Sequence, residues 1–305
     1  MARFQELGIV LALFVMCTFL AVRSPYFLTL ENLLNVLRQI SVVGIVAVGE
    51  ALVIISGGID LSVGSILALC GVSTALLIKS GLNFVLAGLV GIGIGAFVGA
   101  VNGVLVVKGR IAPFIVTLGM LSIARGITYL LTGGMPTTFE SPLALLGSGY
   151  ILGVPVSVIV MFIVVFWGHA FATRTVTGRY VFAVGDNERA ARLSAIKVDE
   201  IKMFVYIVSG CLSALAGIIL AGNLYTADTA AGVGLELDAI AAAVIGGASL
   251  AGGQGSIFGV LIGSALMGVL RNGFVLLGVS AYWQTVTIGL VIIGSVAIDH
   301  LRKRE

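Results

Sequence analysis

An isolated carboxylate, Asp60, lies in the stretch Ile55-Ser-Gly-Gly-Ile-Asp-Leu-Ser-Val-Gly-Ser65, with long apolar runs on both sides. A carboxylate in this setting could hold a helix break in shape, form part of a gate or contact a polar solute. Polar groups and irregular backbone at membrane depth persist only where protein or a water-filled cavity satisfies them. The stretch therefore predicts a broken helix beside a permeation path, or a hinge that works one.

Other polar residues inside or at the edges of apolar runs are candidates for the same path. Each ionisable one would be costly if it faced lipid, so these residues are expected to face the protein interior or to reach an interface. A structural salt bridge or a cap for a helix break is the alternative to substrate contact. The pathway and gate candidates are Glu50, Asp60, Ser62, Asn102, Thr117, Arg125 and Asp238.

The residue types that an enzyme needs are scarce. Both histidines, His169 and His300, are expected at helix ends, and no Gly-x-x-x-x-Gly-Lys-Ser/Thr loop is present to cradle nucleotide phosphates. Residues 250–254 read Leu-Ala-Gly-Gly-Gln, close to the signature of ABC ATPases, but without a phosphate loop they are interpreted as a helix break. We therefore expect no catalytic, cofactor-binding or metal-binding residue in this chain.

These candidates must be positioned by membrane helices. Hydrophobic residues make up 59% of the chain and charged residues 10%, with a mean hydropathy of +1.17, whereas soluble domains carry roughly 25% charged residues. Because a bilayer core needs roughly 20 apolar residues per helix, the sequence predicts an all-α polytopic membrane protein with about ten spans, some broken or re-entrant, in one domain covering residues 1–305. The predicted spans are 7–22, 36–56, 63–78, 83–107, 114–132, 152–171, 203–222, 238–253, 256–278 and 284–299.

Basic residues predict the orientation of the chain. Several of them fall between residues 173 and 202, and Arg302, Lys303 and Arg304 end the sequence. Positively charged segments stay in the cytoplasm, and four spans between the two segments allow both to do so. Six spans before the first segment then place the N-terminus in the cytoplasm as well. This pattern orients the chain, and no nucleic-acid partner is expected.

The segment 173–202 contains a short amphipathic stretch. Asp186 or Asn187 is suited to cap a helix, whose small apolar face would comprise Ala190, Ala191, Leu193 and Ile196. One interpretation is a helix that lies on the bilayer surface. Because the stretch has small residues and neither Trp nor Phe, docking into a groove of a partner protein is favoured.

Glycine spacing predicts close helix packing in both halves. Gly91, Gly95, Gly99 and Gly103 recur every four residues, a pattern that lets a neighbouring backbone approach one helix face, and Gly259 and Gly263 repeat it. The halves also echo each other, since an acid precedes each Gly-rich break: Glu50 before residues 57–65 and Asp238 before residues 246–256. Paired broken helices in internal repeats are typical of transporters.

Four motifs in order resemble one family across nearly the whole chain, the permeases of ribose, xylose, galactose and arabinose ABC importers. The motifs are Gly57 to Ser65, Ala112 to Met120 with Ala124-Arg-Gly126, Gly178 to Ile196, and Glu236 to Ala241 leading into Gly246 to Ser256. The resemblance implies a permease of the bacterial inner membrane that works with a second permease copy or a sister permease. It also implies a cytoplasmic ABC ATPase, which binds ATP and Mg, and a periplasmic sugar-binding protein.

The same resemblance implies that the amphipathic segment docks on the ATPase. The implied coupling residues are Arg179, Asp186, Asn187, Glu188, Ala190, Ala191, Arg192, Leu193 and Ile196. The family usually has Ser-Gly-Ile where this chain has Ser194-Ala-Ile196, a difference that puts the turn after the coupling helix in question. An uncharged sugar needs a path of modest polarity, for which Asn102 and Thr117 are candidates.

Three alternatives remain open at this point. A secondary transporter also uses broken helices and acids at membrane depth, although it would need no coupling segment. An ABC permease for another solute, such as a branched-chain amino acid, shares the general plan, while the Gly-Gly-Ile-Asp-Leu-Ser motif argues for the sugar branch. The chain could also serve as a structural subunit if a sister permease carried the active path.

Overall fold

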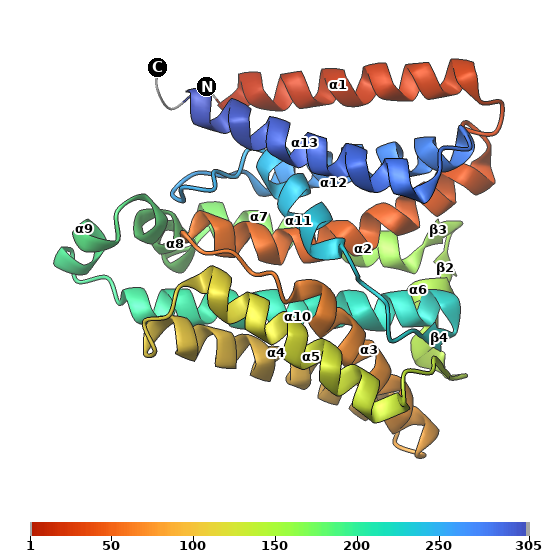
Figure 1. Cartoon of the computed structure of the whole chain (residues 1–305), viewed down its shortest axis with the longest axis horizontal. Coiled ribbons are helices and arrows are strands. Elements are labelled where there is room, and N and C mark those ends of the chain that lie inside the picture. Colours follow the sequence, from red (N-terminus) through yellow and green to blue (C-terminus); the bar gives the residue numbers. More distant parts are fainter. Residues whose placement is uncertain (1, 303–305) are drawn as a thin grey trace.

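Long helices dominate the computed structural model, which describes residues 2–302 (Figure 1). Lys303 and Arg304 of the basic tail lie outside the described residues. The helices are α1 (Ala2–Arg23), α2 (Leu30–Ile55), α3 (Val63–Lys79), α4 (Phe84–Val107), α5 (Pro113–Thr132), α6 (Leu145–Ser148), α7 (Val156–Arg174), α8 (Val176–Asp186), α9 (Glu188–Leu193), α10 (Val198–Leu224), α11 (Leu235–Ile245), α12 (Ile257–Leu276) and α13 (Ala281–Arg302).

Short strands and a 3-10 turn lie at the end of the molecule opposite α9 (Figure 1). The turn η1 spans Pro142–Ala144. Strand β1 (Thr137–Thr138) pairs antiparallel with β4 (Thr226–Ala227), and β2 (Tyr150–Ile151) pairs with β3 (Val154–Pro155) in a hairpin. These pairs join the segment after α5 to the C-terminal end of α10 and lead the chain into α7.

The helical, multi-span character expected from the sequence is confirmed. Six described helices, α2, α4, α5, α7, α10 and α12, are long and apolar enough to cross a membrane, and shorter apolar helices cover Leu7–Arg23, Val63–Lys79 and Ala281–Gly294. The predicted span 238–253 differs, because α11 has 11 residues and ends at Ile245. That is about half of the roughly 20 residues that a full crossing requires, so this segment is a half-helix followed by a break.

Helix α2 lies at the centre of the molecule. Every residue from Val43 to Ile55 is buried, and α2 packs against α7, α10, α11 and α12. Helix α10 is its main neighbour on the other side and also packs against α3 and α4. Glu50, in the second half of α2, is fully buried. Because a carboxyl group that faced lipid would be costly, this residue favours a position of α2 inside the helix bundle.

The glycines of α4 allow its close packing on α10, as their spacing predicted. A Cβ added at Gly95 or Gly99 would overlap the carbonyl oxygen of Gly210 or Tyr206, both on α10. The corresponding pattern on α12 brings Gly259 against the backbone of Gly246. In both halves the glycines replace side-chain contact with backbone contact between neighbouring helices.

The two helix breaks share one geometry. After α2, the Gly58 N–H donates to the Val53 carbonyl at 2.9 Å; after α11, the Ala248 N–H donates to the Ala243 carbonyl at the same distance. Gly57 (φ 83°) and Gly247 (φ 95°) both adopt the left-handed conformation that this helix ending requires. Gly57 therefore corresponds to Gly247, one residue later than the sequence echo paired it, and the acids that precede the breaks do not occupy equivalent positions.

Candidate functional site

A buried polar cluster surrounds the break between α2 and α3. Its members come from α2, α4, α10 and the break itself. They are Glu50, Asp60, Ser62, Asn102 and Ser209, each at most 1% exposed. One Asp60 carboxylate oxygen accepts from the Ser62 N–H at 3.0 Å and from its hydroxyl at 2.5 Å, while the other accepts from the Ser209 hydroxyl at 3.1 Å. Asp60 thus fastens the start of α3 to α10.

Neighbouring helices complete the cluster. The Asp60 N–H donates to the Glu50 carboxyl at 3.1 Å, and the Asn102 amide donates to the Ser62 hydroxyl at 2.9 Å. The Thr117 hydroxyl, on α5, lies 3.2 Å from the Ile59 carbonyl oxygen. Five of the seven pathway candidates therefore meet at one break, which α2, α4, α5 and α10 all contact.

Some polar atoms of the cluster have no hydrogen-bond partner in the described part of the chain. These atoms are Glu50 Oε2, Asn102 Oδ1 and the hydroxyl of Tyr206. Tyr206 lies on α10 against Gly58, since a Cβ added at that glycine would come within 2.6 Å of the tyrosine hydroxyl. Buried groups of this kind carry a free-energy cost of about 1 to 3 kcal/mol each.

Sequence reasoning missed Ser209 and Tyr206. Both lie within the apolar run of α10, where a lone serine or tyrosine gives no signal of its own. Only the packing of α10 against the break brings Ser209 to Asp60 and the Tyr206 hydroxyl to Gly58.

The two remaining pathway candidates lie apart from the cluster. Arg125 donates to the carbonyl oxygens of Thr229 and Ala231 at 2.6 and 2.8 Å, so it fastens α5 to the segment before α11. Asp238 forms an ion pair with Arg271 at 2.6 Å and connects α11 to α12. The structure therefore separates one predicted group of residues into three locations.

The amphipathic segment forms α8 and α9 at one end of the molecule (Figure 1). The Asn187 side chain caps α9 by accepting from the Ala190 N–H at 3.0 Å, which decides between the two predicted caps. Ala191 is buried, whereas Leu193 projects outward with 90% of its surface exposed. The outer surface of α9 thus presents one large apolar side chain among charged ones.

The turn after α9 is formed without the usual glycine. Ala195 has φ 61°, in the left-handed region, and the Ile196 N–H donates to the Ala191 carbonyl at 3.1 Å. This is the same helix ending that Gly57 and Gly247 form. Replacement of the family's glycine by alanine therefore preserves the turn and introduces strain at Ala195.

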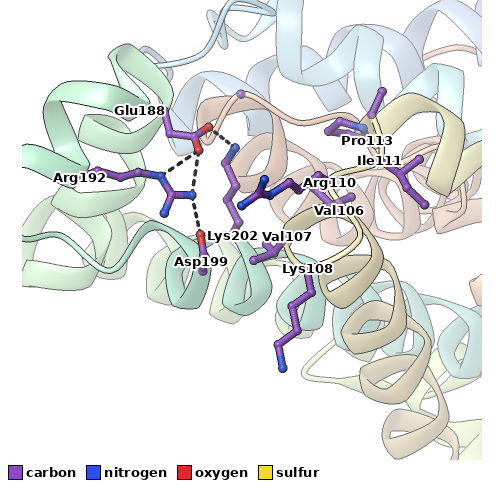
Figure 2. A pocket seen from close by; sticks show the side chains of 12 residues that line it. Val106, Val107, Lys108, Arg110, Ile111, Pro113, Glu188, Arg192, Asp199 and Lys202 are labelled. Atoms are coloured by element: carbon purple, nitrogen blue, oxygen red, sulfur yellow. Dashed lines mark hydrogen bonds and ion pairs between the residues drawn. The ribbon is translucent and has the colours of Figure 1, made fainter.

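Charged side chains connect α9 to the start of α10. Figure 2 shows Glu188 between Arg192 and Lys202, with Arg192 also reaching Asp199. The distances are 3.0 Å from Arg192 to Glu188, 2.5 Å from Arg192 to Asp199 and 2.6 Å from Lys202 to Glu188. The hydrogen bond from Lys202 holds the pKa of the Glu188 carboxyl below its ordinary value, with Arg192 acting in the same direction.

A pocket of about 830 Å³ opens beside these ion pairs (Figure 2). One wall is formed by α9 and the start of α10. The opposite wall is the turn between α4 and α5, including Lys108 and Arg110, and Gly57 of the α2 break also lines the pocket. The pocket thus places the charged face of α9 and the end of α2 around one space.

The C-terminal end of α8 contacts both helix breaks directly. The Gly253 N–H, in the break after α11, donates to the free carbonyl of Ile55 at the end of α2 at 2.9 Å. Gly185 lies against both: a Cβ there would overlap the Ile55 carbonyl oxygen and lie 2.6 Å from the Gly253 nitrogen. Gly252, at φ 84°, would also clash with the Gly185 carbonyl if it carried a Cβ. We call Ile55, Gly185, Gly252 and Gly253 the backbone junction.

The other coupling candidates lie on α8, on α9 and in the turn after α9. Arg179, Asp186, Ala190 and Arg192 are exposed, and Ile196 is half-buried. Among the described residues, no group of three His, Cys, Asp or Glu side chains is placed to hold a metal ion. Within this site, α8 is the element that contacts both breaks.

Comparisons with known proteins identify the class. The family described as the branched-chain amino acid transport system permease component matches residues 32–296. The ribose import permease proteins of Bacillus subtilis (strain 168) and Escherichia coli (strain K12) are each 46% identical to this chain, over 97% and 96% of its length and 92% and 93% of theirs. The D-allose transport system permease protein of Escherichia coli (strain K12) is 39% identical over 94% of the chain and 89% of its own length.

No solved structure shows significant similarity to the chain. The family match argues against the secondary transporter, and the relatives support the sugar-permease resemblance drawn from the four motifs. A permease component has no catalytic role of its own and works with a separate ATPase. The chain therefore belongs to this family of permease components and is a multi-pass membrane permease of an ABC importer.

Proposed function

We propose that this permease carries a monosaccharide into a bacterial cell, with D-ribose as the first substrate to test. The observation that carries the proposal is the 46% identity to two ribose import permeases over nearly the whole of each chain. In this proposal the protein lies in the inner membrane, with α9 and both termini in the cytoplasm. A cytoplasmic ATPase, a periplasmic sugar-binding protein and a second permease copy or a sister permease complete the importer.

The backbone junction supplies the coupling step. When ATP closes the two ATPase subunits, α9 moves with the groove in which it is seated. Gly185 contacts Ile55 and Gly253 without intervening side chains, so movement of α8 shifts the end of α2 and the break between α11 and α12 together. The cavity between the two permease copies then opens toward the periplasm.

The buried polar cluster has a structural role in this mechanism. Asn102 and Thr117 are fully buried in contacts with the break, so neither meets a sugar unless the break moves. Asp60 joins the start of α3 to α10 through its hydrogen bonds with Ser62 and Ser209. Its substitution is therefore expected to disturb assembly or gating before it changes the choice of sugar.

A reconstitution tests the function. The permease, its ATPase and its binding protein are placed in proteoliposomes, and ATP-dependent uptake of labelled ribose, allose, xylose and leucine is measured. We expect ribose uptake only when all components and ATP are present. Omission of the ATPase is the control, and concentrative uptake without it would overturn the mechanism. Uptake of leucine in place of any sugar would overturn the substrate class.

A further inference from the structure

A second pocket lies near the end of the molecule opposite α9. It has a volume of about 250 Å³ and lies between α2, α10, α11 and α12. Pockets for drug-sized ligands begin at roughly 300 Å³, so this space suits a smaller molecule. Its polar lining residues are Arg38, Gln39, Asn223, Asp238 and Arg271, and we call it the outer pocket.

The polar groups of the outer pocket retain unused hydrogen-bonding capacity. Asp238 is 3% exposed, and only one of its two carboxylate oxygens is taken up by the ion pair with Arg271. The other oxygen, together with the Nε atoms of Arg271 and Arg38, has no partner within the described part of the chain. An unpaired buried carboxylate oxygen carries a free-energy cost. All three atoms are covered from solvent, so a ligand hydroxyl relieves this cost if the lining side chains shift to admit it.

The rest of Arg38 is held in place. Its guanidinium donates to Asn35 at 3.2 Å and to the Tyr150 hydroxyl, and it lies 4.9 Å from the centre of the Tyr150 ring. Tyr150 belongs to the β2–β3 hairpin, so the hairpin fixes this wall of the pocket from outside. Arg38 and Asp238 thus stand fixed before any ligand arrives, which lowers the entropic cost of binding.

The chemistry of the lining favours a neutral, polyhydroxylated ligand. Hydroxyl groups both donate and accept, and this lining offers an acceptor in Asp238, donors in the two arginines and both functions in Gln39 and Asn223. Val42, Val43 and Leu220 supply an apolar wall for the C–H face of a sugar ring.

We propose that the outer pocket binds the monosaccharide inside the permease, between its release from the binding protein and its passage past the breaks. This inference rests on the proposed function and adds a location to it. A neutral sugar can use the Asp238 acceptor and the arginine donors together, whereas an anion such as phosphate would use only the arginines and be repelled by Asp238. Inorganic phosphate therefore serves as the competing probe.

Direct binding tests the pocket. The permease–ATPase complex in nanodiscs, without binding protein, is titrated with D-ribose, and binding is followed by ligand-observed NMR. We expect Gln39→Ala and Asn223→Ala each to weaken ribose binding about three- to tenfold, the effect of one lost hydrogen bond. Glu140→Gln, an exposed carboxylate in the segment between α5 and η1, is the control and should bind like the wild type.

The same variants are then assayed with liganded binding protein and ATP. If the wild type takes up sugar and both pocket variants bind ribose with unchanged affinity, the outer pocket is not the binding site, while the proposed function stands. Absence of all sugar uptake by the wild type would overturn both. The assignment of the outer pocket as a sugar site would also be wrong if the wild-type complex showed no detectable ribose binding. It would be wrong as well if inorganic phosphate displaced bound ribose. Gln39 is exposed, so Gln39→Ala should fold. This variant therefore still tests the pocket if Asn223→Ala does not assemble.

Discussion

Replacing Ala195 by glycine should stabilise the turn that ends α9. Ala195 is exposed and has φ 61°, so removal of its methyl group loses no buried contact. An L-residue in the left-handed conformation costs about 1 to 2 kcal/mol, and glycine removes this cost. Glycine also makes the unfolded chain more flexible, which lowers the free energy of unfolding by about 0.4 to 1 kcal/mol. The net expectation is a gain of roughly 0.5 to 1 kcal/mol.

The same substitution elsewhere in α9 provides a matched control. Ala190 is also exposed but lies within the right-handed helix, so Ala190→Gly should cost about 1 kcal/mol. The two variants therefore differ by roughly 1.5 to 2 kcal/mol, and a factor of ten in an equilibrium corresponds to about 1.4 kcal/mol.

Hydrogen exchange of the permease in nanodiscs measures this difference through local opening of α9. The reporting amide is that of Ile196, which donates to the Ala191 carbonyl at 3.1 Å. Its exchange should slow in Ala195→Gly and accelerate in Ala190→Gly, with more than tenfold between them. Equal acceleration in both variants would show that the backbone strain assigned to Ala195 is absent.

Three further outcomes follow from the described contacts. Gly99→Ala forces a Cβ onto the Tyr206 carbonyl oxygen and should destabilise the protein by about 1 to 3 kcal/mol, whereas Gly93→Ala meets open space; equal thermal stability of the two variants would contradict the packing described for α4 and α10. The pKa of Glu188 is lowered by Lys202, so this ion pair stabilises the fold above the ordinary carboxyl pKa of about 4.3 and is lost as pH falls below it. Protection of the α9 amides should therefore drop between about pH 5 and pH 3, and a wild-type profile identical to that of Glu188→Gln would refute the assignment. Asp60→Asn weakens the hydrogen bonds to Ser62 and Ser209 and should lower assembly yield or ATPase coupling while the order of preferred sugars stays the same; altered sugar preference with intact coupling would contradict this.

Hydropathy predicted the spans well because long apolar runs have few other uses. The run 83–107 becomes α4 almost residue for residue, whereas α2 begins at Leu30, six residues before the predicted start at 36, and ends at Ile55. The bounds of α11 were missed, because apolar residues such as Ala248 and Leu250 continue past the break at Gly247. Hydropathy measures apolar character, whereas the end of this helix depends on a left-handed glycine.

The candidate site was predicted only in part. The residues of the break near Asp60 and the coupling segment stood out by type and setting. The backbone junction did not, since it joins positions 55, 185 and 253, whose contact leaves no local pattern in the sequence. Ser209 was missed for the same reason, and the separation of Arg125 and Asp238 from the cluster depends on helix packing that spacing alone does not encode.

The backbone junction has a consequence for how importers of this kind are re-engineered. Ile55 takes part through its carbonyl oxygen and Gly253 through its amide nitrogen, and Gly185 has no side chain. The outward side chains of α9, including Leu193, take no part in it. In the proposed mechanism, recognition of the ATPase and transmission of its motion therefore involve different atoms. Replacing the outward side chains of α9 by those of another permease should therefore change which ATPase binds, while the backbone junction stays intact.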